Sequence, residues 1–461
     1  MRRVWIAFLL VFCIIGVARA DCATTQITVD ENTCVDAKFN VTTTRLSADN
    51  QFSFSLSAVG IFYVDWGDGS IQTISRDNTT NTAYSHTYTT AGVKIIRFGG
   101  VATGYTTVDN STAAAAISFR NNTYVAGIDG SLGAIFPTLA NGSQPRFYST
   151  FSSCTNLTSD IPEELFDGIY GAPVTNMFRS TFYMDSGLTG SIPSGLFRGL
   201  NGPPASGVFY STFNSCSGLT GSIPADLFAG LNGAPAENMF YQTFYGCSGL
   251  TGSIPGGLFR GIVGAPATSM FKSAFYKCSG LSGSIPGNLF SGISGPAADS
   301  MYYYMFGSCS GLTGYVPPYL FSGITSGSTT NIMRYMFYNT GLVSTCPSGT
   351  TTYTTGWESY FSGSNSYNQT FVACTKDSGC EDGYLSYNGN CYQSCRFAEN
   401  LHIGTLTSFS MFAELPTSVP HSIVLKMGTS VCYVPLESGT GQLNIEMTDG
   451  IYHAVSADTN V

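Results

Sequence analysis

The sequence predicts a multidomain, β-rich protein: a β-sandwich, an α/β solenoid of 31-residue units, a small Cys-rich module and a small C-terminal β module. Three observations support this fold class. A strict 31-residue repeat occupies the middle of the chain, alternating apolar residues precede it, and closely spaced cysteines follow it. A fixed period of roughly 20 to 50 residues is typical of a solenoid, whose units bury their apolar faces against one another.

The composition argues against disorder and against nucleic-acid binding. Charged residues make up only 10% of the 461 residues, against about 25% in an average soluble protein. Hydrophobic residues make up 43%, which is too many for a disordered chain. Without the three arginines of the leader, 16 basic residues face 28 acidic ones. A protein that neutralises phosphates needs a basic patch, so we expect no nucleic-acid partner.

The first twenty residues have the features of a signal peptide. Arg2 and Arg3 precede a 14-residue apolar run that ends at Val17, and a small-x-small cleavage pattern ends at Ala20. A membrane helix is the alternative, but this run is shorter than the ~20 residues needed to cross a bilayer. We therefore expect cleavage between Ala20 and Asp21, no membrane span in the mature chain, and a secreted or cell-surface protein.

The domain boundaries follow the changes in sequence pattern. We expect a signal peptide over 1–20, a β-sandwich over 21–103, the solenoid over 104–345, a Cys-rich module over 346–397 and a C-terminal β module over 398–461. Within the solenoid, residues 104–145 form an irregular cap and about six full repeats extend to residue 342. A cap is expected because the bare end of a solenoid exposes its core.

The repeat places residues of one kind in columns that are 31 positions apart. One column consists of Cys154, Cys216, Cys247, Cys278 and Cys309, with Asp185 in the same register. A leucine follows three residues after each member of this column, and Ile-Pro and Leu-Phe pairs keep the same step. These columns predict a continuous apolar core along the solenoid.

Each unit is predicted to contain one helix and one short strand. Val174, Met177, Phe178 and Phe182 follow the spacing of one helix face, and a short extended run follows at residues 188–192. Adjacent strands lie ~4.8 Å apart, whereas adjacent helices need about 10 Å. We therefore expect an arc with the strands on its concave face.

Two parts of the chain resemble known families. The pattern LxGxIPxxLF is similar to extracellular leucine-rich repeats, and MFxxxFxxCSGL resembles the BspA-like leucine-rich-repeat surface proteins of bacteria over about Arg146 to Leu342. Before the repeats, VDWGDGS followed by SHTYTTAGVKIIRF resembles the polycystic-kidney-disease (PKD) type of β-sandwich. The first resemblance implies a leucine-rich-repeat solenoid that serves adhesion or binding of host proteins. The second implies a spacer or binding module.

Six cysteines outside the repeat column are disulfide candidates, because an exported protein meets an oxidising environment. These candidates are Cys22, Cys34, Cys374, Cys380, Cys391 and Cys395. Zinc is the alternative for the last four, but their spacing lacks paired CxxC motifs or a nearby histidine. The cysteines of the repeat column are expected to be buried free thiols, with disulfides between repeats as the alternative.

The sequence contains no recognisable catalytic or metal-binding motif. Its histidines do not form HExxH, and neither a GxSxG motif nor a phosphate-binding glycine-rich loop is present. We therefore expect no enzyme, no catalytic residue, no metal and no cofactor. A catalytic site built from dispersed residues is the alternative.

Two sets of repeated polar residues are candidate ligand-binding residues. The first set, predicted to face outward from the strands, is Thr189, Thr220, Thr251, Ser282 and Thr313. The second set, on the predicted helices, is Tyr210, Tyr241 and Tyr303. A uniform hydroxyl face suits a repetitive partner such as a glycan, and tyrosine is favoured at protein interfaces. We expect adhesion or binding to an extracellular protein or glycan; the alternative is a structural spacer that displays the C-terminal module.

Overall fold

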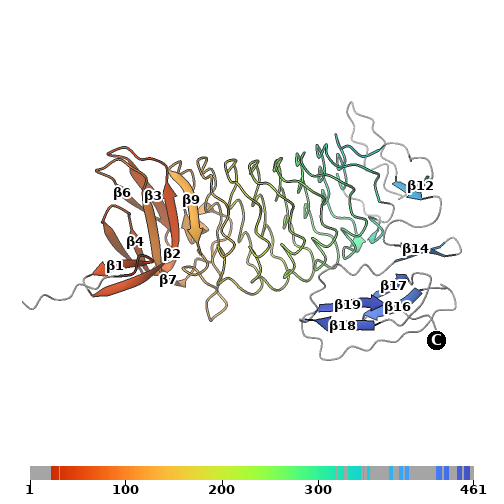
Figure 1. Cartoon of the computed structure of the whole chain (residues 1–461), viewed down its shortest axis with the longest axis horizontal. Helices are drawn as coiled ribbons and strands as arrows, with labels where there is room; N and C mark the ends of the chain where they lie inside the picture. Colours follow the sequence, from red (N-terminus) through yellow and green to blue (C-terminus); the bar gives the residue numbers. More distant parts are fainter. Residues whose placement is uncertain are drawn as a thin grey trace, which may run out of the picture.

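The computed structural model describes residues 22–30, 32–317, 320–325, 331–343 and 346, together with the backbone of short strands between residues 350 and 456. A β-sandwich lies at one end of a row of stacked coils (Figure 1). The described residues contain one short 3-10 helix, η1 (Thr112–Ala114), and no α-helix. None of their segments is a helix long and apolar enough to cross a membrane. The predicted leader, residues 1–20, lies outside the described residues.

The sandwich consists of two antiparallel sheets. Its strands are β1 (Gln26–Asp30), β2 (Thr33–Thr43), β3 (Gln51–Leu56), β4 (Val59–Asp65), β5 (Ile71–Arg76), β6 (Thr82–Thr87), β7 (Ile95–Gly104), β8 (Ile117–Ser118) and β9 (Val125–Gly130). One sheet has the order β1-β2-β7-β4-β5, with β9 also paired to β2, and the other has the order β6-β3-β8. In β3, Phe52, Phe54 and Leu56 are buried and alternate with more exposed residues, as the period of a strand requires.

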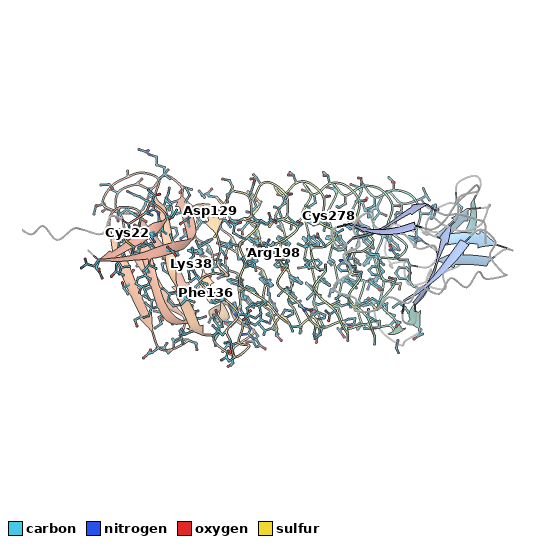
Figure 2. The ribbon with its side chains drawn as sticks, turned by 60° about the horizontal axis from the view of Figure 1, so that its bottom comes forward. Cys22, Lys38, Asp129, Phe136, Arg198 and Cys278 are labelled. Carbon is cyan, nitrogen blue, oxygen red and sulfur yellow. A yellow bond between two sulfur atoms is a disulfide. The ribbon has the colours of Figure 1, made fainter. Side chains whose placement is uncertain are left out.

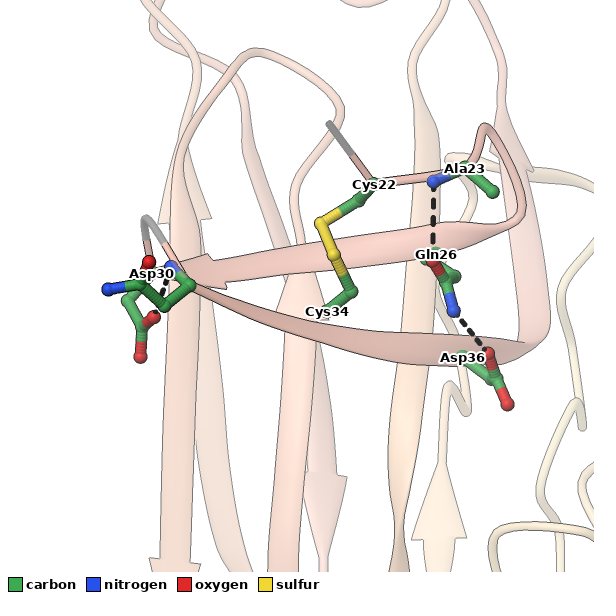
Figure 3. The surroundings of a disulfide bond; sticks show 7 residues. Cys22, Ala23, Gln26, Asp30, Cys34 and Asp36 are labelled. Atoms are coloured by element: carbon green, nitrogen blue, oxygen red, sulfur yellow. Dashed lines mark hydrogen bonds between the residues drawn. A yellow bond between two sulfur atoms is a disulfide. The ribbon is translucent and has the colours of Figure 1, made fainter. Parts of the chain in front are cut away.

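Aromatic side chains fill the space between the two sheets. Phe54 of β3 meets Phe98 of β7 edge to face, with ring centroids 5.1 Å apart. Trp66 is buried beside them, and the Tyr88 hydroxyl donates a hydrogen bond of 2.8 Å to its carbonyl oxygen. Cys22 and Cys34 form a disulfide next to the β1–β2 pair (Figure 3). The amino-terminal end of the chain is thereby tied to the sandwich.

The sandwich and the solenoid share one core. Strands β8 and β9, which come from the segment predicted to cap the solenoid, pair with β3 and β2 of the sandwich. Phe119, which follows β8, stacks on Phe151 of the first coil at 5.6 Å. Lys38 of β2 donates to the carbonyl oxygens of Gly100 and Ala134, and so also joins the two parts (Figure 2). The sandwich itself therefore covers the first end of the coil stack.

The predicted helices are absent, so the α/β leucine-rich-repeat solenoid is wrong. The segments expected to be helical are runs of consecutive turns, as residues 176–185 illustrate. There the odd-numbered N–H groups donate to the carbonyl three residues earlier, as Thr181 does to Phe178. The even-numbered N–H groups donate to the next coil, as Phe178 does to Val208 at 3.0 Å. Because the N–H groups donate alternately within their own coil and to the next coil, every backbone N–H of the run has an acceptor although no helix forms.

Left-handed backbone conformations at every fourth residue explain why no helix forms. Asn176, Ser180 and Met184 have φ of 57°, 55° and 63°. A left-handed residue costs roughly 1–2 kcal/mol and interrupts a right-handed helix. The apolar spacing of three and four residues, which matches a helix face, matches a run of four-residue turns equally well. Most other coils place Ser, Asn, Gln or Gly at these positions, and Ser, Asn and Gly are common in turns.

The expected arc is also wrong, because its cause was the width of the helices. Without helices, neighbouring coils are separated by the same hydrogen-bonding distance on each side of the stack. The coils therefore form a nearly straight row (Figure 1). Parallel pairings such as Gly202 with Leu231 and Gly233 with Ile262 link successive coils on another side. The short strands β10 (Gly295–Pro296) and β11 (Ile324–Thr325) pair in the same parallel way.

Phenylalanine columns run through the interior of the stack. One column contains Phe151, Phe182, Phe213, Phe244, Phe275, Phe306 and Phe337. Successive rings in this column are stacked with centroids 5.5 to 6.0 Å apart. The core of the sandwich and of the coils is one cluster that extends from Phe39 to Leu342. The 31-residue period therefore sets which buried groups face each other.

The remaining strands form antiparallel pairs after the coils. They are β12 (Thr350–Tyr353), β13 (Ala373–Lys376), β14 (Tyr384–Tyr387), β15 (Asn390–Gln393), β16 (Ser422–Met427), β17 (Ser430–Pro435), β18 (Asn444–Thr448) and β19 (Ile451–Ser456). Strand β12 pairs with β13, β14 with β15, β16 with β17 and β18 with β19. The side chains of the disulfide candidates Cys374, Cys380, Cys391 and Cys395 lie outside the described residues.

Candidate functional site

The predicted threonine and serine residues form one exposed row along the coils. Every member of this Thr/Ser row (Thr189, Thr220, Thr251, Ser282 and Thr313) is exposed. From Thr220 onward, each backbone N–H donates to a glycine carbonyl of the preceding coil at 2.7 to 2.9 Å. The Thr220 hydroxyl also donates to the Gly190 carbonyl at 3.1 Å. The row is a regular array of hydroxyl and methyl groups without charge.

A second set of residues lies on the surface formed by the stacked turn runs, of which residues 176–185 are one. We call this surface the turn wall. The predicted Tyr210, Tyr241 and Tyr303 fall in one column of this wall, and all are partly exposed. Their column, here named the tyrosine–cation column, consists of Tyr148, Arg179, Tyr210, Tyr241, Lys272, Tyr303 and Arg334. The structure thus brings the predicted tyrosines together with basic residues of the same register.

Direct contacts run along the tyrosine–cation column. The Arg179 guanidinium lies 4.0 Å from the ring centroid of Tyr210 and 5.4 Å from that of Tyr148. The rings of Tyr210 and Tyr241 are stacked at 4.3 Å. The Lys272 ammonium then lies 5.4 Å from the Tyr241 ring and 5.2 Å from the Tyr303 ring. These cation–π contacts, worth ~0.5–1 kcal/mol at exposed sites, hold the cations in line.

Neighbouring columns of the turn wall add further tyrosines. The ring centroids of Tyr245 and Tyr276 lie 5.1 Å apart, and the Lys277 ammonium contacts both rings. Tyr304 and Tyr335 stack at 4.6 Å. Burial and the neighbouring tyrosines raise the pKa of Tyr304 to about 12, so its hydroxyl is protonated at physiological pH and available as a donor.

Charge is separated between the turn wall and another side of the coils. In the described turn runs, the outward columns that begin at Arg179, Ser180, Tyr183 and Met184 contain basic side chains and no acidic one. The acidic side chains Glu163 and Asp167 lie elsewhere on the coils, and both pair with Arg198, which Figure 2 labels. These four columns are therefore a basic and aromatic surface, next to Glu237 and Asp299, which begin the turn runs of their coils.

The cysteine column is buried and serves packing rather than chemistry. Cys154, Cys216, Cys247, Cys278 and Cys309 are free thiols without solvent exposure. Each thiol donates to the carbonyl of a phenylalanine in the preceding coil, as Cys216 does to Phe182 and Cys247 to Phe213, both at 2.9 Å. Burial raises the pKa of the Cys154, Cys216, Cys247 and Cys278 thiols, that of Cys247 to about 12. A nucleophilic cysteine would need the opposite shift.

This arrangement predicts the reactivity of the column. In the native protein, Ellman's reagent should leave these thiols unmodified, whereas unfolding in guanidinium chloride without reductant should release all of them. Non-reduced mass spectrometry of alkylated peptides identifies which cysteines react. If the denatured protein yields at most one reactive thiol from the column, disulfides between coils replace the thiol–carbonyl bonds described above.

The described residues offer no enclosed site for a metal or a small ligand. They contain no group of three His, Cys, Asp or Glu side chains arranged to hold a metal ion. Between the sheets of the sandwich, a cavity of about 10 Å³ is lined by apolar residues that include Phe54, Phe62 and Phe98. This cavity is about the size of one water molecule.

The basic members of the turn wall were not among the residues predicted from the sequence. Arg179, Lys272 and Arg334 occupy the same column as the predicted tyrosines, so the 31-residue register was the signal that could have found them. Comparison with protein families, curated proteins and solved structures finds no match to this chain.

Proposed function

We propose that the protein is an exported binding protein, secreted or at the cell surface, that uses the coil stack to bind an extracellular protein or glycan in adhesion. The observation that carries this proposal is the tyrosine–cation column, which repeats one chemistry along a rigid axis. Tyrosine and arginine side chains are enriched at protein interfaces, where they supply much of the binding energy. The exposed Thr/Ser row is the second candidate surface.

A structural spacer is the second candidate function. The continuous core from the sandwich to the last described coil favours it, because such a core makes a stiff rod. In this alternative, the working part is the C-terminal region after residue 398.

Three variants of the mature full-length protein distinguish these surfaces. Replacing Tyr210, Tyr241 and Tyr303 together with Ala is expected to weaken capture of the partner found in a panel of glycans and matrix proteins, because the column loses three of its rings. Replacing Thr220, Thr251 and Ser282 together with Lys tests the Thr/Ser row, whose exposed side chains tolerate substitution. Removing residues 398–461 tests the spacer.

Binding by solid-phase capture and folding by circular dichroism are measured for each variant. The tyrosine variant should lose about tenfold or more in affinity, as expected for interface anchors worth ~1.4 kcal/mol or more. Full binding by both triple variants, together with loss on removal of 398–461, would show that the coils are only a spacer.

A further inference from the structure

We propose that the ligand of the turn wall is a linear anionic polysaccharide that lies along the solenoid axis; this inference rests on the function proposed above. Its sulfate or carboxylate groups would pair with Arg179, Lys272 and Arg334, and its sugar hydroxyls with the tyrosine hydroxyls between them. The geometry of the column, the free charges of two of its cations and the acidic residues elsewhere on the coils support this ligand class.

The cations lie in a line that suits an extended polymer. Arg179 and Lys272 are three coils apart, and Lys272 and Arg334 are two coils apart. Coils joined by backbone hydrogen bonds repeat at ~4.8 Å, so these intervals are roughly 14 Å and 10 Å along the axis. A linear polysaccharide with charges at regular intervals can reach all three cations without bending.

Arg179 and Lys272 are not neutralised by the protein. Among the described residues, no carboxylate lies within ion-pair distance of either side chain; their cationic groups contact tyrosine rings and, for Arg179, also the Asn176 side-chain oxygen at 3.4 Å. Arg198, by contrast, pairs with Glu163 and Asp167. A cation–π contact positions a cation but leaves its charge and its N–H donors for an anion.

Acidic residues elsewhere on the coils favour a narrow ligand. Glu237 and Asp299 are the first residues of the turn runs of their coils, and Glu163, Glu164 and Asp226 lie on other sides. A broad anionic surface, such as a nucleic-acid duplex or an acidic protein, would meet these carboxylates as well as the cations. A single polysaccharide chain can contact the tyrosine–cation column alone.

The test compares polymers that differ only in charge. Biolayer interferometry of the mature full-length protein should show binding to dextran sulfate and none to dextran of the same length. Polygalacturonate adds a carboxylate polymer, so the preferred anion is identified as sulfate or carboxylate. Because the attraction is between exposed charges, affinity should fall as the salt concentration rises.

Matched double variants locate the binding surface. R179Q with K272Q removes two positive charges from the turn wall, and R198Q with R260Q removes the same charge from another side of the coils. The first pair should weaken dextran sulfate binding by about tenfold or more, since each substitution removes a charge-assisted hydrogen bond to the polymer. The second pair should change it by less than about twofold. Melting curves confirm that both variants are folded.

Three results would overturn the inference: no binding of dextran sulfate, equal binding of dextran, or equal loss in the two double variants. Equal or tighter binding of duplex DNA of the same charge would also contradict it. In each case, the function proposed above stands if the tyrosine triple variant loses capture of a neutral glycan or a protein. The two proposals therefore fail separately.

Discussion

Removal of residues 217–247, one complete 31-residue unit, is expected to leave a folded and slightly less stable protein. The deletion places each buried group opposite an equivalent one, so the Phe column, the thiol–carbonyl bonds and the backbone bonds between coils all re-form. Solenoid stability is approximately a sum of unit and neighbour terms, so one unit is lost and the others remain. Guanidinium unfolding should show a single transition with a smaller m-value, because less surface is buried.

A deletion of 217–231 is the control, because it removes only about half of the unit. It places the buried Phe240 and Phe244 in the register of the exposed Ala225 and Ala229, so the core of one coil meets the surface of the next. We expect no cooperative unfolding transition and loss of the native circular dichroism spectrum. Equal tolerance of the two deletions would contradict the stacking of coils.

Replacing Asp185 with Cys is expected to stabilise the protein at neutral pH. Asp185 is fully buried in the cysteine column; its carboxylate accepts one bond from the Cys154 N–H at 2.8 Å, and its other oxygen has no partner. A buried polar group without a partner costs about 1–3 kcal/mol. A cysteine at this position would donate to the Phe151 carbonyl, by the same relation that joins Cys216 to Phe182.

The pKa of the Asp185 carboxyl determines whether stability rises or falls with pH. Burial raises the pKa of the Asp185 carboxyl well above its usual range. Below pH ~4 the carboxyl is protonated in the folded and unfolded states, so it adds no penalty of ionisation. As the pH rises, only the unfolded chain releases the proton, and stability falls by up to about 1.4 kcal/mol per pH unit until the raised pKa is reached.

The advantage of the Asp185→Cys protein over the natural chain should therefore grow between pH 4 and pH 7. Urea unfolding of both proteins at several pH values measures this difference, in which the effects of all other titrating groups cancel. Asp185→Asn is the matched variant that removes the charge without adding a thiol donor. A difference that does not change with pH would mean that the carboxyl is ionised in the folded protein.

The interior of the coils could be predicted from the sequence, and their backbone could not. Residues such as Leu188, Phe182 and Cys216 are buried because a column of identical apolar residues has to face its own copies. The turn runs were mistaken for helices because the spacing of Met177, Phe178 and Phe182 fits both a helix face and a series of four-residue turns. The four-residue spacing of Asn176, Ser180 and Met184 distinguishes them, since a helix has no reason to repeat turn-forming residues at that interval.

The same contrast applies to the candidate site. Tyr210, Tyr241 and Tyr303 could be selected from the sequence because they share a register and a side-chain chemistry that suits interfaces. Arg179 and Lys272 could not be selected by identity, since each interrupts the column. Their importance depends on the distance to a tyrosine ring above and below, which only the stacking of the coils determines.

The turn wall depends on alternate N–H groups that donate to the next coil. Scalar couplings across hydrogen bonds, measured by NMR on the deuterated protein, test this claim directly. The Phe178 amide nitrogen should couple to the Val208 carbonyl carbon, and the Phe182 nitrogen to that of Thr212. Couplings of Phe178 to Val174 and of Phe182 to Phe178, the pattern of an α-helix, would contradict the account.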